Sequence, residues 1–233
     1  MTAGFTLVDE QPDFVVLNKA EGVSFHSDDG AGLVVLAANA LGYPLFAVHR
    51  LDKVTSGLIL LARSSEAAAC LSKLFLEQQI EKYYLALSAA KPVKKQGWVK
   101  GDMTPARRGS WKLLSTAVQP AVTYYISRGF TGLDFRVFLV KPFTGKTHQI
   151  RVALKSQRAA ILGDTQYQAA AADRVYLHAY ALRFNYNGML YQYLCLPTSG
   201  AHYLQLVQTG ELADWAEPWN LAWPAYTQPK QFN

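Results

Sequence analysis

Short apolar runs rich in β-branched and aromatic residues recur along this chain, and each run ends in turn-forming or charged residues. They lie at 5–8, 14–19, 45–51, 57–63, 82–88, 123–127, 133–140, 177–184 and 189–196. Runs of this length and composition are typical of β-strands. Turn chemistry at 9–13 and at 185–188 predicts that the flanking runs form hairpins. The pattern favours a sheet in which sequential strands pair antiparallel.

Three segments carry a helical pattern instead. Residues 32–42 predict a short apolar helix that ends at Gly42, and residues 147–157 change to a helical period with Thr147 as the expected cap. Between them, Ser64 or Ser65 is placed to cap a helix, with Glu66 in its first turn. The apolar face of that helix comprises Ala67, Leu71, Leu74 and Phe75. Few helices among many strands predict an α+β fold, a mixed and mainly antiparallel central sheet with covering helices.

Length and composition bound the class of protein. The 233 residues are half hydrophobic, which is enough for a substantial core, and no internal repeat or low-complexity linker divides them. We therefore expect one domain over 1–233. No apolar run has membrane-spanning length, and the first residues lack the basic-then-apolar order of a signal peptide, so we expect a cytoplasmic protein that does not bind membranes.

The charge and the cysteines add weaker constraints. A net charge of +6 fits a polyanionic partner and also fits an ordinary soluble enzyme. Cys70 and Cys195 both lie in apolar surroundings and form no C-x-x-C pattern. We expect two buried thiols and neither a disulfide framework nor a zinc site.

The loop "HRLDKVTSG", residues 49–57, carries more chemistry than a turn needs. Thr55, Ser56 and Gly57 satisfy the turn, so that Arg50 and Asp52 are surplus to it. An Asp in a turn often caps a backbone N–H group, but loops on a rigid sheet are also where catalytic residues are usually carried.

A second loop offers the loop aspartate a partner. In "TGKTHQIRVAL", residues 144–154, Arg151 falls in the second turn of the predicted helix, either facing solvent or aimed inward at a carboxylate. If it meets Asp52, the guanidinium holds the carboxylate ionised and oriented, as a partly buried nucleophile requires. A purely structural ion pair between the loops is the alternative.

The segment 91–112 combines seven basic residues with one acid, and Trp98 and Trp111 are interleaved among them. Basic groups that neutralise phosphates beside aromatic faces are what a nucleic-acid groove needs. A solvated loop anchored by its tryptophans has the same composition. The RNA-contact candidates in the segment are Lys94, Lys95, Arg107 and Arg108.

Several of these stretches together resemble the RluA-type pseudouridine synthases. They are "NKAEGV", "HRLDKVTSGL", "KYYLAL", "TGKTHQIRV" followed by "ILGDTQY", and "YLHAYALRF", in that family's order from Asn18 to Phe184. The resemblance implies the catalytic domain of that family and an isomerase that converts selected uridines in structured rRNA or tRNA to pseudouridine, without cofactor or metal. Some family members carry a basic RNA-binding domain before the catalytic domain, and because Asn18 lies so close to the start we expect none here. We also expect a monomer.

The resemblance assigns roles residue by residue. Asp52 is implied as the catalytic aspartate, Arg151 as its ion-pair partner, and Tyr84 as the aromatic residue stacked on the target uracil. Arg50 corresponds to the residue that fills the space of the extruded base. The remaining substrate-binding candidates are Leu51 and Ile150 as apolar walls, with Lys19 and Lys146 on the surfaces that face RNA. Ala20, Lys146 and Ala153 depart from the family's common Pro, Arg and His.

Elementary chemistry agrees with these roles. Isomerisation breaks the bond from N1 to C1′ and rejoins the sugar at C5, so a carboxylate is useful either to attack a carbon centre or to stabilise charge on the sugar. Whether Asp52 attacks C1′ of the ribose or C6 of the ring stays open, and so does the group that takes the C5 proton, for which Tyr84 and a water are candidates. The base must first leave its stack, which calls for an aromatic platform and a plug.

Other classes fit less well. A metal-dependent nuclease built on His49, Asp52 and His148 lacks further ligands at suitable spacing. A serine hydrolase lacks the G-x-S-x-G pattern. A noncatalytic RNA-binding or RNA-folding protein on the same fold is the main alternative, and the presence of both Asp52 and Arg151 argues against it.

Overall fold

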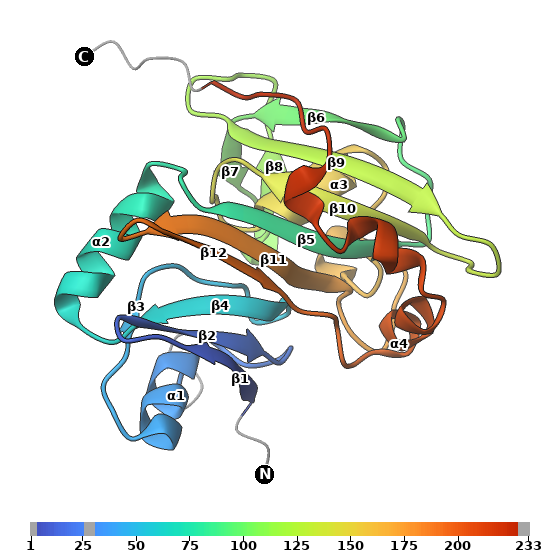
Figure 1. The fold of residues 1–233 in the computed structure, drawn as a ribbon. Helices are drawn as coiled ribbons and strands as arrows, with labels where there is room; N and C mark the ends of the chain where they lie inside the picture. The colour runs from blue at the N-terminus through green and yellow to red at the C-terminus, as the bar shows by residue number, and fades with distance from the viewer. Residues whose placement is uncertain (1–3, 26–30, 228–233) are drawn as a thin grey trace.

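A ten-stranded sheet organises the chain in the computed structural model, which describes residues 4–25 and 31–227 (Figure 1). Its strands follow the order β1-β2-β4-β11-β5-β10-β9-β6, with β12 paired to β11 and β3 paired to β4. Their bounds are β1 Phe5–Glu10, β2 Phe14–Lys19, β3 Phe46–Ala47, β4 Ser56–Ala62, β5 Glu81–Ser88, β6 Gln96–Gly101, β9 Ala121–Gly129, β10 Arg136–Pro142, β11 Leu177–Tyr186 and β12 Met189–Leu194. The β4–β11 pair is parallel and the other pairs described are antiparallel. The predicted α+β class with a mainly antiparallel sheet is confirmed.

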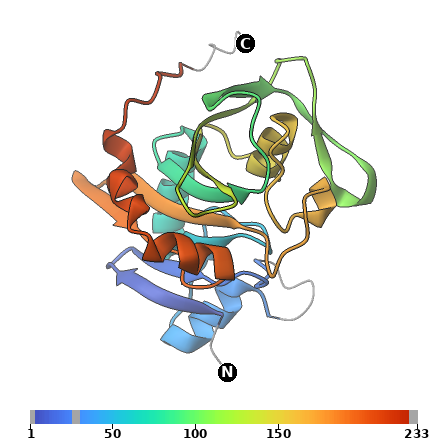
Figure 2. The ribbon, with the colours of Figure 1, turned by 90° about the vertical axis from the view of Figure 1, so that its right-hand side faces the viewer.

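Helices cover both sides of the sheet. The α-helices are α1 Leu33–Leu41, α2 Ser65–Leu76, α3 Gln149–Ser156 and α4 Ala201–Gln208, and the 3-10 turns are η1 Arg107–Gly109, η2 Thr165–Tyr167, η3 Glu211–Trp215 and η4 Pro218–Asn220. In Figure 2, α3 lies on one side of the sheet, and α4 with the C-terminal segment lies on the other. None of the helices in the described ranges has the length and apolar character that crossing a bilayer requires.

Strand β4 forms the centre of the N-terminal half, and all of its residues are buried. Successive side chains point to opposite faces, so Leu58 and Leu60 pack in a cluster with α2, while Ile59 and Leu61 pack in a cluster with α1. Each buried aliphatic side chain contributes about 1.5–3 kcal/mol. This double-sided packing makes β4 a rigid support for the loop that precedes it, which contains Asp52.

Gly57 explains the end of the "TSG" sequence. It lies at the start of β4, where Ser56 pairs with His178 and Gly57 with Ala179 of β11. Its φ of +106° favours glycine, and a Cβ atom there would come within 2.3 Å of the Ala179 carbonyl oxygen. A side chain at this position would force the two strands apart beside the loop.

The predicted strand over 45–51 is wrong in extent, since β3 covers only Phe46–Ala47. The strand ends early because the His49 side chain takes the place of a backbone hydrogen bond between the strands. His49 accepts a hydrogen bond from the backbone N–H of Leu60 at 2.9 Å through Nε2, and its ring stacks on Phe75. The chain therefore leaves the sheet after Ala47 and continues into the loop that contains Asp52.

Helix termini agree in part with the sequence predictions. Gly42 ends α1 in the left-handed conformation, and Ser64 caps α2 by accepting from the Ala67 N–H. Thr147 does not cap α3, because the helix begins after His148, which adopts a φ of 55° and provides no side-chain cap. The Gln149 side chain instead fixes the turn before the helix by accepting from the Lys146 N–H at 3.0 Å.

Two further predictions need correction. Cys70 is exposed and Cys195 is half-buried, so these free thiols are not both buried. Cys70 neighbours Leu71 in α2 but lies off the stripe that faces the sheet. The basic segment 91–112 is not a plain loop, because it contains β6 and a separate two-stranded sheet of β7 Met103–Pro105 and β8 Trp111–Leu113.

Candidate active site

A pocket of about 650 Å³ opens between the loop before β4, strand β5, the end of α2 and the connection from β10 to α3. Most of the substrate-site candidates line it, namely Arg50, Leu51, Asp52, Tyr84, Lys146, Ile150 and Arg151. Leu51 and Ile150 are buried, as expected of apolar walls, while Arg50 and Lys146 are exposed. Segments separated by about a hundred residues in sequence thus contribute to one cavity.

The carboxylate of Asp52 has only distant ionic partners. Its Oδ2 lies 3.6 Å from Arg151 Nη1 and 3.9 Å from His148 Nε2, and its side chain is 20% exposed. Within the described residues, no donor forms a hydrogen bond with this carboxylate. The predicted proximity of Asp52 and Arg151 is confirmed, and the lone pairs of Asp52 remain available to a substrate.

Arg151 has a stronger partner, which the sequence analysis missed. Its Nε and Nη2 donate to the two oxygens of Asp164 at 2.7 and 2.8 Å, and both side chains are buried. The hydrogen bonds and charge of Asp164, together with the charge of Asp52, raise the pKa of Arg151 despite its burial. The bidentate pair fixes the guanidinium plane, so that its remaining nitrogen points at Asp52.

The position of Asp164 depends on the glycine that precedes it in the chain. Gly163 adopts a φ of +83°, and a Cβ atom there would lie 1.8 Å from the carbonyl oxygen of Arg174. The "LGD" sequence in "ILGDTQY" is therefore a close-packed turn that carries a buried carboxylate. A Gly-Asp pair after a predicted helix that contains an Arg is the sequence signal that could have indicated this partner.

Tyr84 lies on β5 and lines the pocket. Burial and the nearby charge of Asp52 raise the pKa of its phenol. The group therefore stays protonated at neutral pH, which fits a stacking platform better than a general base. Tyr84 and Asp52 line the same pocket, so the two can act on one substrate nucleotide.

His148 and Tyr167 complete the surroundings of Asp52. The Tyr167 hydroxyl accepts from the backbone N–H of Trp111 at 3.0 Å, and its oxygen lies 2.9 Å from His148 Nδ1. When the hydroxyl donates to Nδ1, the imidazole presents its Nε2–H toward Asp52. Burial and the charge of Arg151 lower the pKa of His148, which keeps the ring neutral in this arrangement.

The backbone after Asp52 is held by the "NKAEG" segment. The carbonyl of Lys53 accepts from the Gly22 N–H at 2.8 Å and from Lys19 Nζ at 3.3 Å. Lys19 Nζ also donates to the carbonyls of Ala20 and Val23, and burial lowers its pKa to about 8. Lys19 is fully buried, so the expectation that it lies on an RNA-facing surface is wrong.

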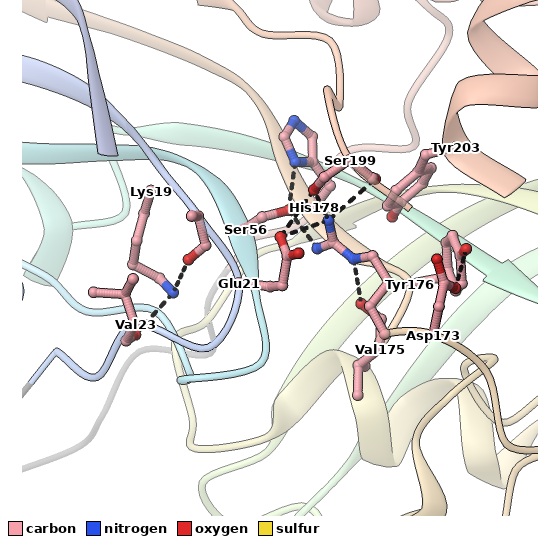
Figure 3. Close-up of polar contacts among 12 residues, drawn as sticks. Lys19, Glu21, Val23, Ser56, Asp173, Val175, Tyr176, His178, Ser199 and Tyr203 are labelled. Carbon is pink, nitrogen blue, oxygen red and sulfur yellow. Dashed lines mark hydrogen bonds and ion pairs between the residues drawn. The ribbon is translucent and has the colours of Figure 1, made fainter. Parts of the chain in front are cut away.

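A buried polar network fixes the other end of the loop (Figure 3). Arg174 pairs with Glu21 at 2.9 Å and donates from Nη2 to Ser56 Oγ at 2.7 Å. Ser56 in turn lies 2.8 Å from His178 Nδ1, and His178 Nε2 faces the carbonyl of Cys195. The serine accepts from Arg174 and donates to His178, so that the neutral imidazole donates through Nε2. Asp52 thus lies on a loop anchored on both sides.

The basic segment is divided between two places. The backbone carbonyls of Lys94 and Lys95 accept from Tyr125 and Ser127 beside the start of β6, at the opposite end of that strand from the β7–β8 hairpin. Arg107 and Arg108 form the exposed turn of that hairpin. The structure therefore does not bring the four basic candidates into one cluster.

The hairpin turn is connected to Arg151 through Gln166. The amide nitrogen of Gln166 donates to the carbonyl of Arg108 at 3.0 Å, and its oxygen accepts from Arg151 Nη2 at 2.6 Å. A second pocket of about 350 Å³ adjoins this contact and is also lined by Arg50, Asp52 and His148. Arg50 lines both pockets, which places it at their common boundary.

The residues proposed for a metal site do not form one. His49 is half-buried, its Nε2 accepts from the Leu60 N–H, and desolvation lowers its pKa to about 3. Across the described residues, no group of three or more His, Cys, Asp or Glu side chains is arranged to hold a metal ion. The polar groups near the Asp52 carboxylate are instead a guanidinium, an imidazole and a phenol.

Comparisons with known proteins place this chain in a family. Residues 13–156 match the RNA pseudouridylate synthase family. An uncharacterized RNA pseudouridine synthase of Haemophilus influenzae is 47% identical over 203 residues, which cover 85% of this chain and 90% of that protein. The ribosomal large subunit pseudouridine synthase C of Rickettsia bellii is 34% identical over 170 residues, 69% of this chain and 56% of its own length.

A solved structure shows the same fold. Human RNA pseudouridylate synthase domain containing 4 superimposes with a TM-score of 0.70 at 23% identity, covering 87% of this chain and 91% of that chain. The chain belongs to the RNA pseudouridylate synthase family and is an enzyme that isomerises uridine in RNA to pseudouridine. The resemblance seen in the sequence is confirmed.

Proposed function

We propose that this enzyme isomerises a specific uridine in structured ribosomal or transfer RNA, with Asp52 as the catalytic carboxylate and with no metal or small-molecule cofactor. The observation that carries the proposal is the convergence of Asp52, Tyr84 and Arg151 on one pocket. The name of the Rickettsia relative supports ribosomal RNA as substrate, and that relative is considerably longer than the aligned region. The ten-stranded sheet that runs through the described residues supports a single catalytic domain. We propose that this domain works as a monomer in the cytoplasm.

The pocket suits an extruded base. A uridine inside a helix must leave its stack before its C1′ and C5 atoms are accessible, at a cost of a few kcal/mol. Tyr84 offers an aromatic face for the extruded uracil, and Leu51 and Ile150 supply apolar walls. Arg50 is exposed at the rim, where its guanidinium is placed to occupy the space that the base leaves.

The chemistry requires no co-reactant. The bond from N1 to C1′ breaks, the detached uracil rotates, C5 bonds to C1′, and the C5 proton is lost while N1 gains one. Asp52 stabilises the electron-poor sugar or bonds to it, and Arg151 keeps the carboxylate oriented. Because Asp164 already neutralises much of the Arg151 charge, the guanidinium orients Asp52 without a short hydrogen bond that would reduce its nucleophilicity.

The test compares RNA from cells with and without this gene by chemical labelling of pseudouridine. We expect at least one uridine in ribosomal or transfer RNA to lose its label when the gene is deleted. The purified wild-type protein should restore the label in vitro in excess chelator, while Asp52→Asn should not. Restoration by Asp52→Asn, or a dependence on added divalent ion with an RNA that needs none to fold, would contradict the proposal. Binding of RNA by both proteins with turnover by neither would favour a noncatalytic RNA-binding protein.

A further inference from the structure

The end of the active-site pocket near α2 is not explained by the roles assigned so far. The lining near α2 comprises His49, Ser72, Phe75, Gln78 and Lys82, and both His49 and Lys82 contact the Phe75 ring. Asp52 instead faces Arg151 of α3. A volume of about 650 Å³ leaves room beyond one flipped uracil. The question is which chemical group the α2 end accepts.

Lys82 is directed into the pocket by the geometry of β5. Residues two apart on a strand face the same side, so Lys82 and Tyr84 project together. The ammonium lies over the ring of Phe75, 5.7 Å from its centroid. No carboxylate among the described residues pairs with it, and burial lowers its pKa to about 8. An ammonium kept partly out of water without a counter-ion favours an anionic ligand.

Two neutral groups beside Lys82 are also unengaged. Within the described chain, neither the Ser72 hydroxyl nor the Gln78 side-chain amide makes a hydrogen bond. Gln78 follows α2 with a φ of 59°, a conformation that glycine or asparagine adopts more easily. A cation with a hydroxyl and an amide donor around it is the set of groups that binds a phosphate.

We propose that Lys82, Ser72 and Gln78 form a subsite for a phosphate of the RNA strand next to the target uridine. The inference rests on the proposed function in that it assigns the Asp52 end of the pocket to that uridine. The Lys82 ammonium lies over Phe75 of α2, whereas the Asp52 carboxylate faces Arg151 and His148. Lys82 is thus more remote from the reacting atoms, as a contact to a flanking phosphate requires. The subsite would hold the strand in register while the base rotates.

A binding experiment tests this without depending on turnover. The probe is the single-stranded pentanucleotide AAUAA, whose one uridine sets the register and needs no extrusion from a helix. We expect Lys82→Met to weaken binding on the order of tenfold. Lys73→Met on the same helix-strand unit is the matched control, since Lys73 is exposed and pairs with Glu77, and it should bind as the wild type does. Lys82→Arg should restore most of the affinity.

Replacing single phosphates of the probe by neutral linkages identifies the phosphate that the subsite binds. Each phosphate of the probe is replaced in turn by methylphosphonate, and one replacement should weaken the wild type as much as Lys82→Met does while leaving Lys82→Met unaffected. The double variant Ser72→Ala, Gln78→Ala should be less sensitive than the wild type to that same methylphosphonate replacement. This variant keeps the test decisive if Lys82→Met folds poorly. Unchanged binding by Lys82→Met, or equal sensitivity of both proteins to every linkage, would overturn the subsite. Normal binding with slowed isomerisation would also overturn it and assign Lys82 to the uracil. Failure of the proposed function appears separately, as loss of pseudouridine formation by the wild type.

Discussion

Arg151 donates two short hydrogen bonds to Asp164, at 2.7 and 2.8 Å, while its Nη1 stays 3.6 Å from Asp52. The two carboxylates therefore have different tasks, although both contact one guanidinium. Asp164 neutralises the buried guanidinium of Arg151 and fixes the orientation of that group. Asp52 faces the pocket, and its carboxylate oxygens make no hydrogen bond within the described residues. They are therefore available to bind a substrate.

The first prediction separates the two carboxylates. Asp52→Asn should abolish isomerisation with little change in stability, since it removes a half-buried charge that makes no short contact. Asp164→Asn should leave Arg151 without its buried partner and destabilise the fold by about 3–5 kcal/mol. Urea unfolding and single-turnover rates measure the two effects. Equal destabilisation by both substitutions would contradict the division of tasks.

Gln166 should couple the hairpin turn to catalysis. Gln166→Ala removes the bridge between the Arg108 carbonyl and Arg151, so the single-turnover rate at saturating enzyme should fall while the melting temperature changes little, because this side chain is exposed. Gln168→Ala is the control, since Gln168 is also exposed and contacts Lys155 instead. A loss of affinity without a loss of rate would assign Gln166 to RNA binding alone.

The basic residues of segment 91–112 lie in two separate places, so substitutions at the two places should affect RNA binding differently. Arg107→Gln with Arg108→Gln, beside the active site, should weaken binding and lower the slope of log affinity against log salt by about one for each phosphate that the protein no longer neutralises. Lys94→Gln with Lys95→Gln, at the far end of β6, serves as the comparison with the same charge change. Salt titrations measure both. Equal slopes for both double variants and the wild type would show that the segment is a solvated surface.

Acid should destabilise the fold through His49 and His178. Burial lowers the pKa of His49 to about 3 and that of His178 to about 4, so the folded state keeps both neutral, whereas the unfolded chain protonates them near pH 6.5. Their contribution to stability is complete above pH 6.5 and is lost as the pH falls toward 4. The loss should be on the order of 2–3 kcal/mol for each histidine at pH 4.5.

Urea unfolding at pH 7 and pH 4.5 measures that loss. His49→Gln keeps an acceptor for the Leu60 N–H without a titrating ring, so its unfolding free energy should fall less between the two pH values than that of the wild type. A wild-type stability that does not change between pH 7 and 4.5 would contradict this assignment.

The sequence by itself determined the elements whose cause is local. Alternating apolar runs, the Ser64 cap, the Gly42 terminus and the Asn187–Gly188 turn are properties of neighbouring residues, and the structure contains each of them. The pairing of Asp52 with Arg151 could be inferred because each is a charge without a local purpose. The family could be inferred because its motifs are short, ordered and specific.

Tertiary structure alone decided the remaining points. The burial of Lys19, the bidentate hold of Asp164 on Arg151 and the bridge from Gln166 to Arg108 all join residues far apart in the chain or hidden by packing. Sequence spacing reports which face of a helix or strand a residue occupies, and it does not report what lies opposite that face. A buried cation needs partners that only the folded chain brings within hydrogen-bond distance, which is why these contacts could not be assigned from the sequence.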